Sequence, residues 1–117
     1  MAQIQLPHDH GQSMEHQLDT IPTEANFQTV AELFKQLGDG NRLRVFWILC
    51  HGEECLINLS AMMQMSSPAL SHYLKLLREA RLIVSQRRGK EVYYRASDTA
   101  PARALHRMIE QMGQITC

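Results

Sequence analysis

The segment from Ser66 to Leu77 constrains the fold most, because it predicts how a helix begins and which face it buries. Ser66 is a favourable N-cap residue, and Pro68 falls in the first helical turn, where its missing N–H costs nothing. Leucines at helical spacing predict the face that packs on a core, and they are Leu70, Leu74 and Leu77. A shorter helix predicted over 58–63 precedes the turn, so the pair forms a helix-turn-helix candidate.

The opposite face of this helix carries short polar side chains and one cation. The residues on this face and at the N-terminus of the helix are Ser66, Ser67, Pro68, Ser71, His72 and Lys75. Such side chains reach base edges and phosphates in a DNA groove, and a helix N-terminus itself attracts phosphate. An ordinary amphipathic helix with a solvated outer face shows the same pattern, so the helix alone does not decide the function.

The hydrophobic period changes after this helix. Residues 82–88 and 91–95 are rich in β-branched and aromatic side chains around Gly89-Lys90, which predicts a β-hairpin. Its tip is basic, with Arg87, Arg88 and Lys90. The chain has no formal net charge, but residues 72–107 contain nine cations and three acidic residues. A basic hairpin beside a candidate recognition helix favours double-stranded DNA as the partner.

Helices are also predicted over 22–37, 41–50 and 99–114, which makes the fold mainly α with a β-hairpin. Residues 1–21 are polar and show no apolar period, so we expect a flexible N-terminal arm followed by one domain over 22–117. The first and last helices carry apolar stripes, formed by Phe27, Val30 and Phe34 and by Leu105, Met108, Ile109 and Met112. A second copy of the chain would cover both stripes in a homodimer, whereas the alternative is that they close the core of the monomer.

Several classes of protein are disfavoured. The adjacent pairs Ser71-His72 and Cys50-His51 point about 100° apart on a helix, so neither forms a nucleophile–base couple, and we do not expect an enzyme. The apolar run Val45–Cys50 is too short to cross a bilayer. No secretory signal is evident and the cysteines number three, so the expected location is cytoplasmic. A dimeric interaction module that does not bind DNA stays open as an alternative.

The stretch from Glu32 to Ser97 resembles the ArsR/SmtB family of bacterial metal-sensing repressors. The segments that carry this resemblance are AELFKQLGDGNRLRVFWIL and GEECLINLSAMMQMSSPALSHYLKLLREARLIVSQRRGKEVYYRAS. The resemblance implies a homodimeric winged helix-turn-helix protein, with the helix from Ser66 as recognition helix, the hairpin 83–96 as wing and the terminal helices as dimer interface. It also implies that the protein binds an inverted-repeat operator in a metal efflux or resistance operon. A metal ion is then expected to release the protein from this operator.

The same resemblance suggests three places for an effector. Arsenic-type members carry Cys-x-Cys at the third helix, but here Cys55 is followed by Ile57 in the second position. Zinc-type members use the last helix, where this chain keeps Asp98 but has Ala100, Gln111 and Gln114 at the other ligand positions. Between these positions, His106 is expected to be a surface histidine.

The favoured site joins the N-terminal arm to the third-helix cysteine, with His8, His10, His16 and Cys55 as ligands. One thiolate and three imidazoles suit a divalent ion, Zn²⁺ or Cd²⁺ first. Asp9 or Glu15 is able to replace one histidine. Two alternatives stay open: an arm that binds no metal, and an arsenic- or thiol-responsive switch that uses Cys50, Cys55 or Cys117.

Overall fold

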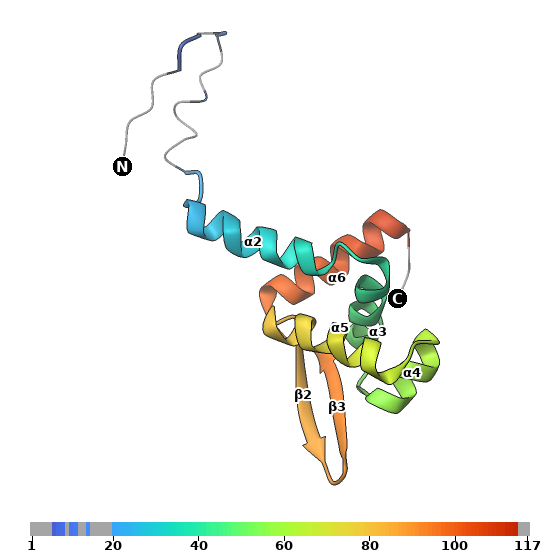
Figure 1. Ribbon diagram of the computed structural model, residues 1–117. Helices are drawn as coiled ribbons and strands as arrows, with labels where there is room; N and C mark the ends of the chain where they lie inside the picture. The colour runs from blue at the N-terminus through green and yellow to red at the C-terminus, as the bar shows by residue number, and fades with distance from the viewer. Residues whose placement is uncertain (1–5, 9, 12–13, 15–19, 115–117) are drawn as a thin grey trace. The chain divides into compact units, whose positions relative to one another are not determined.

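The computed structural model describes residues 6–8, 10–11, 14 and 20–114 (Figure 1). The chain divides into two compact units, residues 1–31 and residues 32–117. The elements in chain order are α2 (Glu24–Gln36), α3 (Gly40–His51), β1 (Glu54–Cys55), α4 (Leu56–Met63), α5 (Ser67–Glu79), β2 (Ile83–Arg88), β3 (Glu91–Ala96) and α6 (Ala100–Gly113). The mainly helical composition and the hairpin predicted from the sequence are confirmed.

Side-chain caps determine where the first two helices begin. The hydroxyl of Thr23 accepts a hydrogen bond from the backbone N–H of Asn26 at 3.3 Å, just before α2. The carboxylate of Asp39 accepts from the N–H of Arg42 at 2.9 Å and caps α3. The Arg42 guanidinium donates to the carbonyl of Gln36 at 2.6 Å, so it satisfies an acceptor at the C-terminal end of α2.

The helix-turn-helix predicted around Ser66 is confirmed. The Ser66 hydroxyl accepts from the N–H of Ala69 at 3.3 Å, and Pro68 lies in the first turn of α5. Gln64 ends α4 in the left-handed conformation with φ 53°, which turns the chain toward α5. The shorter helix begins at Leu56, two residues earlier than predicted, because the preceding strand delivers the chain directly into it.

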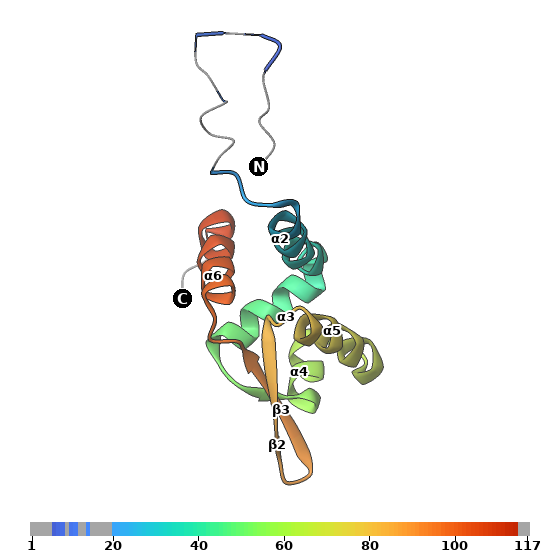
Figure 2. The same cartoon turned by 90° about the vertical axis from the view of Figure 1, so that its left-hand side faces the viewer.

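The hairpin predicted after α5 is also confirmed, and it projects away from the helices (Figures 1 and 2). Strands β2 and β3 pair antiparallel from Ile83↔Ala96 to Arg88↔Glu91, and Gly89 adopts φ +64° in the two-residue turn. The two-residue strand β1 pairs with β3 on its other edge, which makes the sheet order β1-β3-β2. Strand β1 is not predicted by the sequence, because two residues are too few to show a hydrophobic period.

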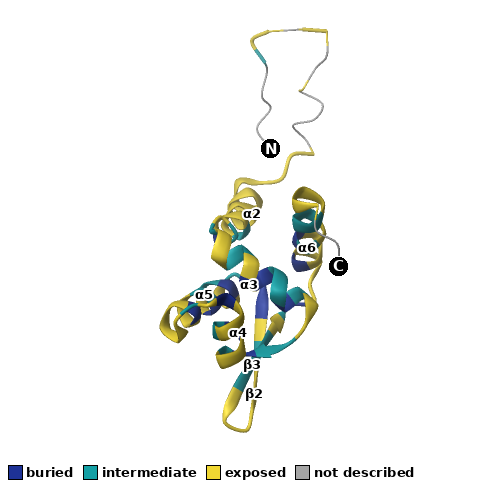
Figure 3. Ribbon diagram, turned by 90° about the vertical axis from the view of Figure 1, so that its right-hand side faces the viewer, coloured by how far each residue is buried: buried dark blue, intermediate teal, exposed yellow. Residues whose placement is uncertain are grey.

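One apolar cluster forms the core of the unit over residues 32–117. Its buried members come from α3 to α6, the start of β2 and Leu82, and they are Val45, Phe46, Leu49, Leu59, Met63, Leu70, Leu74, Leu77, Leu82, Ile83, Ala102 and Leu105. Figure 3 shows buried residues on the inner faces of α3, α5 and α6 and exposed residues at the hairpin tip. The hydroxyl of Thr99 caps α6 by accepting from the N–H of Ala102 at 3.3 Å.

Candidate nucleic-acid interface

The outer face of α5 is a continuous exposed surface. All the residues predicted for this face are exposed, namely Ser66, Ser67, Pro68, Ser71, His72 and Lys75. The inner leucines of the same helix are fully buried, with Leu70, Leu74 and Leu77 at 1% exposure or less. Burial of the leucine face therefore holds the polar face of α5 outward along the whole helix.

The first turn of α5 is tied to the helix before it. The hydroxyls of Ser60 in α4 and Ser67 in α5 lie 3.2 Å apart, in a hydrogen bond that either group can donate. The Ser66 hydroxyl is already used as the helix cap. A phosphate approaching this end would meet the remaining backbone N–H groups of the first turn and the Ser67 hydroxyl.

The wing carries the predicted cations at its tip, but they do not have the same surroundings. Arg87, Arg88 and Lys90 are all exposed. The guanidinium of Arg88 forms an ion pair with Glu53, with one of its two hydrogen bonds at 3.0 Å, and it lies 5.1 Å from the centre of the Tyr93 ring. The guanidinium of Arg87 instead donates to a backbone acceptor, the carbonyl of Gly89, at 3.4 Å. Part of the positive charge of the tip is thus neutralised within the chain.

Further arginines lie between α5 and the wing. Arg78, Arg81 and Arg95 line one cavity of about 500 Å³ together with Asp98. The Arg78 guanidinium donates to the hydroxyl of Ser85 at 3.4 Å and so links the last turn of α5 to β2. In the sequence these arginines are only part of the basic segment, because their common position depends on how α5 packs against the hairpin.

One tyrosine of the wing has a perturbed pKa. The Tyr93 hydroxyl donates to the carboxylate of Glu91 at 2.9 Å. This hydrogen bond, reinforced by the negative charge of Glu91, raises the pKa of Tyr93, and Arg88 partly opposes the shift.

The predicted metal ligands are distributed over both units and the undescribed residues. His8 and His10 belong to residues 1–31, and their ring centroids lie 5.8 Å apart. His16 lies outside the described residues, as does Cys117. Cys55 is 7% exposed, at the end of β1 and at the cap position of α4. No described contact tests whether these residues form one site, so the arm site stays a prediction.

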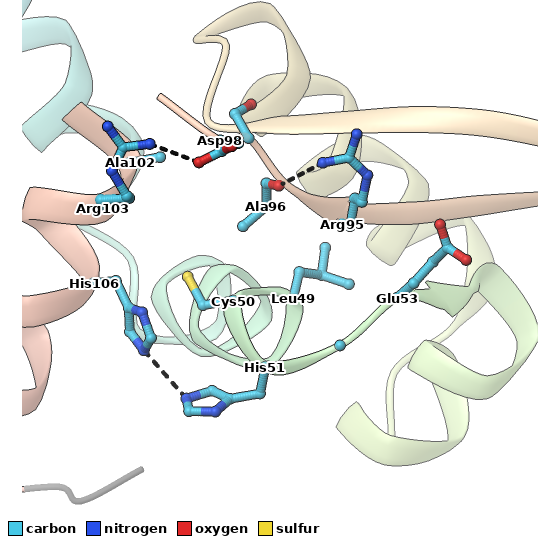
Figure 4. A pocket seen from close by; sticks show the side chains of 12 residues that line it. Leu49, Cys50, His51, Glu53, Arg95, Ala96, Asp98, Ala102, Arg103 and His106 are labelled. Carbon is cyan, nitrogen blue, oxygen red and sulfur yellow. Dashed lines mark hydrogen bonds and ion pairs between the residues drawn. The ribbon is translucent and has the colours of Figure 1, made fainter. Parts of the chain in front are cut away.

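His106, expected to be a surface histidine, is partly exposed and packs against two other side chains. Its side chain is 23% exposed and contacts both His51 and Glu110, because α6 packs its inner face toward the end of α3. Cys50, His51 and His106 line a cavity of about 350 Å³ (Figure 4). Just before α6, Asp98 forms an exposed ion pair with Arg103 at 2.6 Å.

The last helix also borders an apolar groove. Phe34, Leu37 and Leu43 form it together with residues of α6, which are Leu105, Met108, Ile109, Met112 and Gly113. Its volume is about 530 Å³. Leu105 is buried and forms part of the core, whereas Phe34 and Met112 are 51% and 79% exposed. On α2, the other two residues of the predicted interface, Phe27 and Val30, are 50% and 47% exposed.

Comparison with known proteins identifies the family. Residues 39–85, from the cap of α3 into β2, match the family described as bacterial regulatory protein, arsR family. Over 78 residues the chain is 39% identical to the arsenical resistance operon repressor of Escherichia coli (strain K12), across 66% of this chain and 67% of that protein. The chain belongs to the ArsR family. The family resemblance noted in the sequence is therefore confirmed, and the proteins of this family are DNA-binding regulators rather than enzymes.

Two other comparisons extend this assignment. The chain is 42% identical over 71 residues to a transcriptional repressor SmtB homolog from Synechocystis sp. (strain ATCC 27184 / PCC 6803 / Kazusa), across 61% of this chain and only 54% of that protein. A homodimeric winged helix-turn-helix DNA-binding domain from Mycobacterium bovis superposes with a TM-score of 0.70 at 23% identity, covering 80% of this chain and 89% of that one. The architecture of this ArsR-family chain is thus the winged helix-turn-helix. No helix within the described ranges combines the length and apolar character that crossing a bilayer requires.

Proposed function

We propose that this chain is a transcriptional repressor that binds an inverted-repeat operator in double-stranded DNA as a homodimer and is released by a metal ion. The observation that carries the proposal is the exposed polar face of α5 together with the basic tip of the projecting wing. The relatives named as repressors, the SmtB homolog and the arsenical resistance operon repressor, support the same interpretation.

In this proposal α5 enters the major groove and the wing contacts the neighbouring backbone or minor groove. Pro68, Ser71, His72 and Lys75 meet base edges, while Ser66 and Ser67 lie at phosphates. Short side chains at the start of α5 let its backbone approach the groove closely. Arg87 and Lys90 supply phosphate contacts, and Arg88 does so when it leaves Glu53.

The apolar groove beside α6 supports the homodimer of this proposal. Met112 is 79% exposed and Phe34 is half-exposed, although both side chains are apolar. A second copy that covers them removes this apolar area from water, which favours association. The proposed interface consists of Phe27, Val30, Phe34, Leu105, Met108, Ile109 and Met112, with Leu105 as its buried floor. A two-fold pair of recognition helices then matches two half-sites of a palindrome.

The effector is proposed to be a divalent metal ion, Zn²⁺ or Cd²⁺ first. The set predicted from the sequence, His8, His10, His16 and Cys55, is one candidate for its ligands. Because Cys55 is 7% exposed, the start of α4 must open before its thiolate reaches an ion together with the arm. An arsenic- or thiol-responsive repressor, with Cys50, Cys55 or Cys117, is the alternative that the titration below separates.

The test is a fluorescence-anisotropy titration of the full chain against duplexes with and without an inverted repeat, at several salt concentrations. We expect affinity to fall steeply with salt, with Lys90→Ala and Arg87→Ala each reducing the slope by about 1. Lys35→Ala, a loss of the same charge outside the helix-turn-helix and wing, is the control. Equal slopes for all these variants, or no binding to any duplex, would leave a dimeric interaction module as the function.

The effector is tested by adding Zn²⁺, Cd²⁺ or trivalent arsenic to the protein–operator complex. Release by Zn²⁺ or Cd²⁺ that disappears in Cys55→Ser and in a His8/His10/His16→Ala variant supports the arm site. Release by trivalent arsenic alone transfers the assignment to the cysteines. A complex that none of the three disrupts contradicts metal control of the repressor.

A further inference from the structure

Three side chains that are able to bind a metal ion meet where the end of α3 packs against α6. His51 is the last residue of α3, and His106 and Glu110 lie one turn apart on α6. The Nε2 atoms of His51 and His106 are 3.2 Å apart, and Glu110 Oε1 lies 2.5 Å from the same nitrogen of His106. Figure 4 shows the two imidazole rings pointing toward each other from different helices.

We propose that His51, His106 and Glu110 form a binding site for a divalent transition-metal ion, Zn²⁺ first. One potential ligand atom from each residue lies within 4.8 Å of the other two. Zinc binds imidazole nitrogen at 2.0–2.1 Å in tetrahedral geometry, so two of its ligands lie about 3.3 Å apart. The distance of 3.2 Å between the Nε2 atoms of His51 and His106 matches this ligand–ligand distance. Rotation of the Glu110 side chain supplies the third ligand.

The surroundings hold these ligands in place. The Trp47 ring lies one turn before His51 on α3, with its centroid 4.3 Å from that of the imidazole, so it limits how the His51 ring turns. His106 and Glu110 are spaced i and i+4 on α6, where side chains lie above one another on one face. Their side chains are 23% and 18% exposed, which shields the ion partly from water.

Bound metal also resolves an electrostatic difficulty of the cluster. Two neutral imidazoles that face each other through Nε2 require one nitrogen to donate and the other to accept, and two protonated ones repel. Here a single nitrogen of His106 contacts both His51 and Glu110. A divalent cation instead receives lone pairs from all three groups at once, and the carboxylate neutralises part of its charge.

The three ligand groups favour a divalent transition-metal ion over trivalent arsenic. Two imidazoles and one carboxylate are borderline-to-hard ligands, which suit Zn²⁺, Co²⁺ or Ni²⁺ better than the thiophilic trivalent arsenic. His51 is exposed and the adjacent cavity has a volume of about 350 Å³, so a water molecule has room to complete the coordination. The three ligands bind the ion in their deprotonated forms, so protons compete with the metal for this site.

The position of the site connects it to regulation, a step that rests on the proposed function. His51 leads through Gly52 into β1, α4 and the recognition helix, whereas α6 carries the apolar groove of the proposed dimer interface. An ion held by both helices fixes the end of α3 against α6. It thereby biases the spacing of the two recognition helices, with an expected change in operator affinity of about 5- to 150-fold.

The binding test uses the metal-free full chain without DNA, so its outcome does not depend on the proposed function. Co²⁺ is titrated as the probe, because its visible absorption reports tetrahedral coordination by nitrogen and oxygen ligands. Zn²⁺ is then added in competition. We expect one Co²⁺ per chain at this site, displaced by Zn²⁺. His51→Ala, His106→Ala and Glu110→Gln should each weaken Co²⁺ binding at least tenfold.

Matched controls decide between the cluster and other ligands. Glu79→Gln removes an exposed carboxylate on α5, outside both proposed metal sites, and should keep the wild-type affinity and spectrum. Co²⁺ binding that is lost in Cys55→Ser or in a His8/His10→Ala variant instead assigns the ion to the arm site and overturns the cluster. Glu110→Gln preserves side-chain shape, so weaker binding with an unchanged melting temperature is not a folding defect. Less than threefold weakening in the cluster variants overturns the site. Operator binding measured separately without metal tests the proposed function alone.

Discussion

Arg88 in the wing and Glu53 at the start of the loop into β1 form an ion pair across 35 positions of sequence. Their side chains are 50% and 24% exposed, so the pair adds little to stability, about 0–1 kcal/mol. Its consequence concerns DNA binding, because it commits one of the cations at the wing tip to a carboxylate of the same chain. The wing then presents Arg87 and Lys90 as its readily available cations.

Glu53→Gln should therefore strengthen DNA binding. Loss of the carboxylate releases Arg88 for a phosphate, so the salt dependence of affinity steepens by about 0.9 for one further contact. Arg88→Ala should weaken binding less than Arg87→Ala in the wild-type background. Anisotropy titrations across salt concentrations measure both effects, with Glu54→Gln as the variant of equal charge change. Identical slopes for Glu53→Gln and the wild type would contradict this account.

Loss of the α5 cap should reduce stability without removing the outer face of the helix. Ser66→Ala deletes the hydroxyl that accepts from the N–H of Ala69, at an expected cost of about 1 kcal/mol. Thermal or urea unfolding followed by circular dichroism measures this cost. Ser71→Ala, an exposed change within the same helix, should alter stability by less than about 0.5 kcal/mol. Equal effects of the two substitutions would argue against the capping role.

A charge in the apolar groove should dissociate the proposed homodimer. Met112 is 79% exposed, so Met112→Glu leaves the core of each chain intact but places a carboxylate in the interface. Sedimentation velocity at micromolar concentration should show a shift from dimer to monomer. Gln111→Glu adds the same charge beside the groove without lining it, and it should remain dimeric. A wild-type chain that sediments as a monomer would remove the basis for a palindromic operator.

Removal of the Glu91 carboxylate should lower the pKa of Tyr93. The wild-type value is raised by the hydrogen bond to Glu91 and by its negative charge, so Glu91→Gln should move the pKa down toward about 10. Titration of the Tyr93 ring resonances by NMR at high pH measures the change. An unchanged Tyr93 pKa in this variant would show that the hydrogen bond is not maintained in solution.

Much of this fold could be predicted from local sequence. The Ser66 cap, Pro68 in the first turn and the leucines every three or four residues predict α5, because each is a local preference of a helix. The two-residue turn at Gly89 likewise predicts the hairpin, since the glycine adopts φ +64° there. The exposed polar face of α5 follows from the same period, so this part of the candidate interface was predictable as well.

The relations that cross the fold could not be predicted in this way. Glu53 and Arg88, or His51 and His106, are brought together only when the loop after α3 packs against the wing and α3 against α6. The strand β1 exists because β3 offers it an edge, and its two residues have no strand signal of their own. Local preferences act over three or four residues, and they therefore determine the helices, the turn and the hairpin. Long-range packing decides which side chains from distant segments share a site.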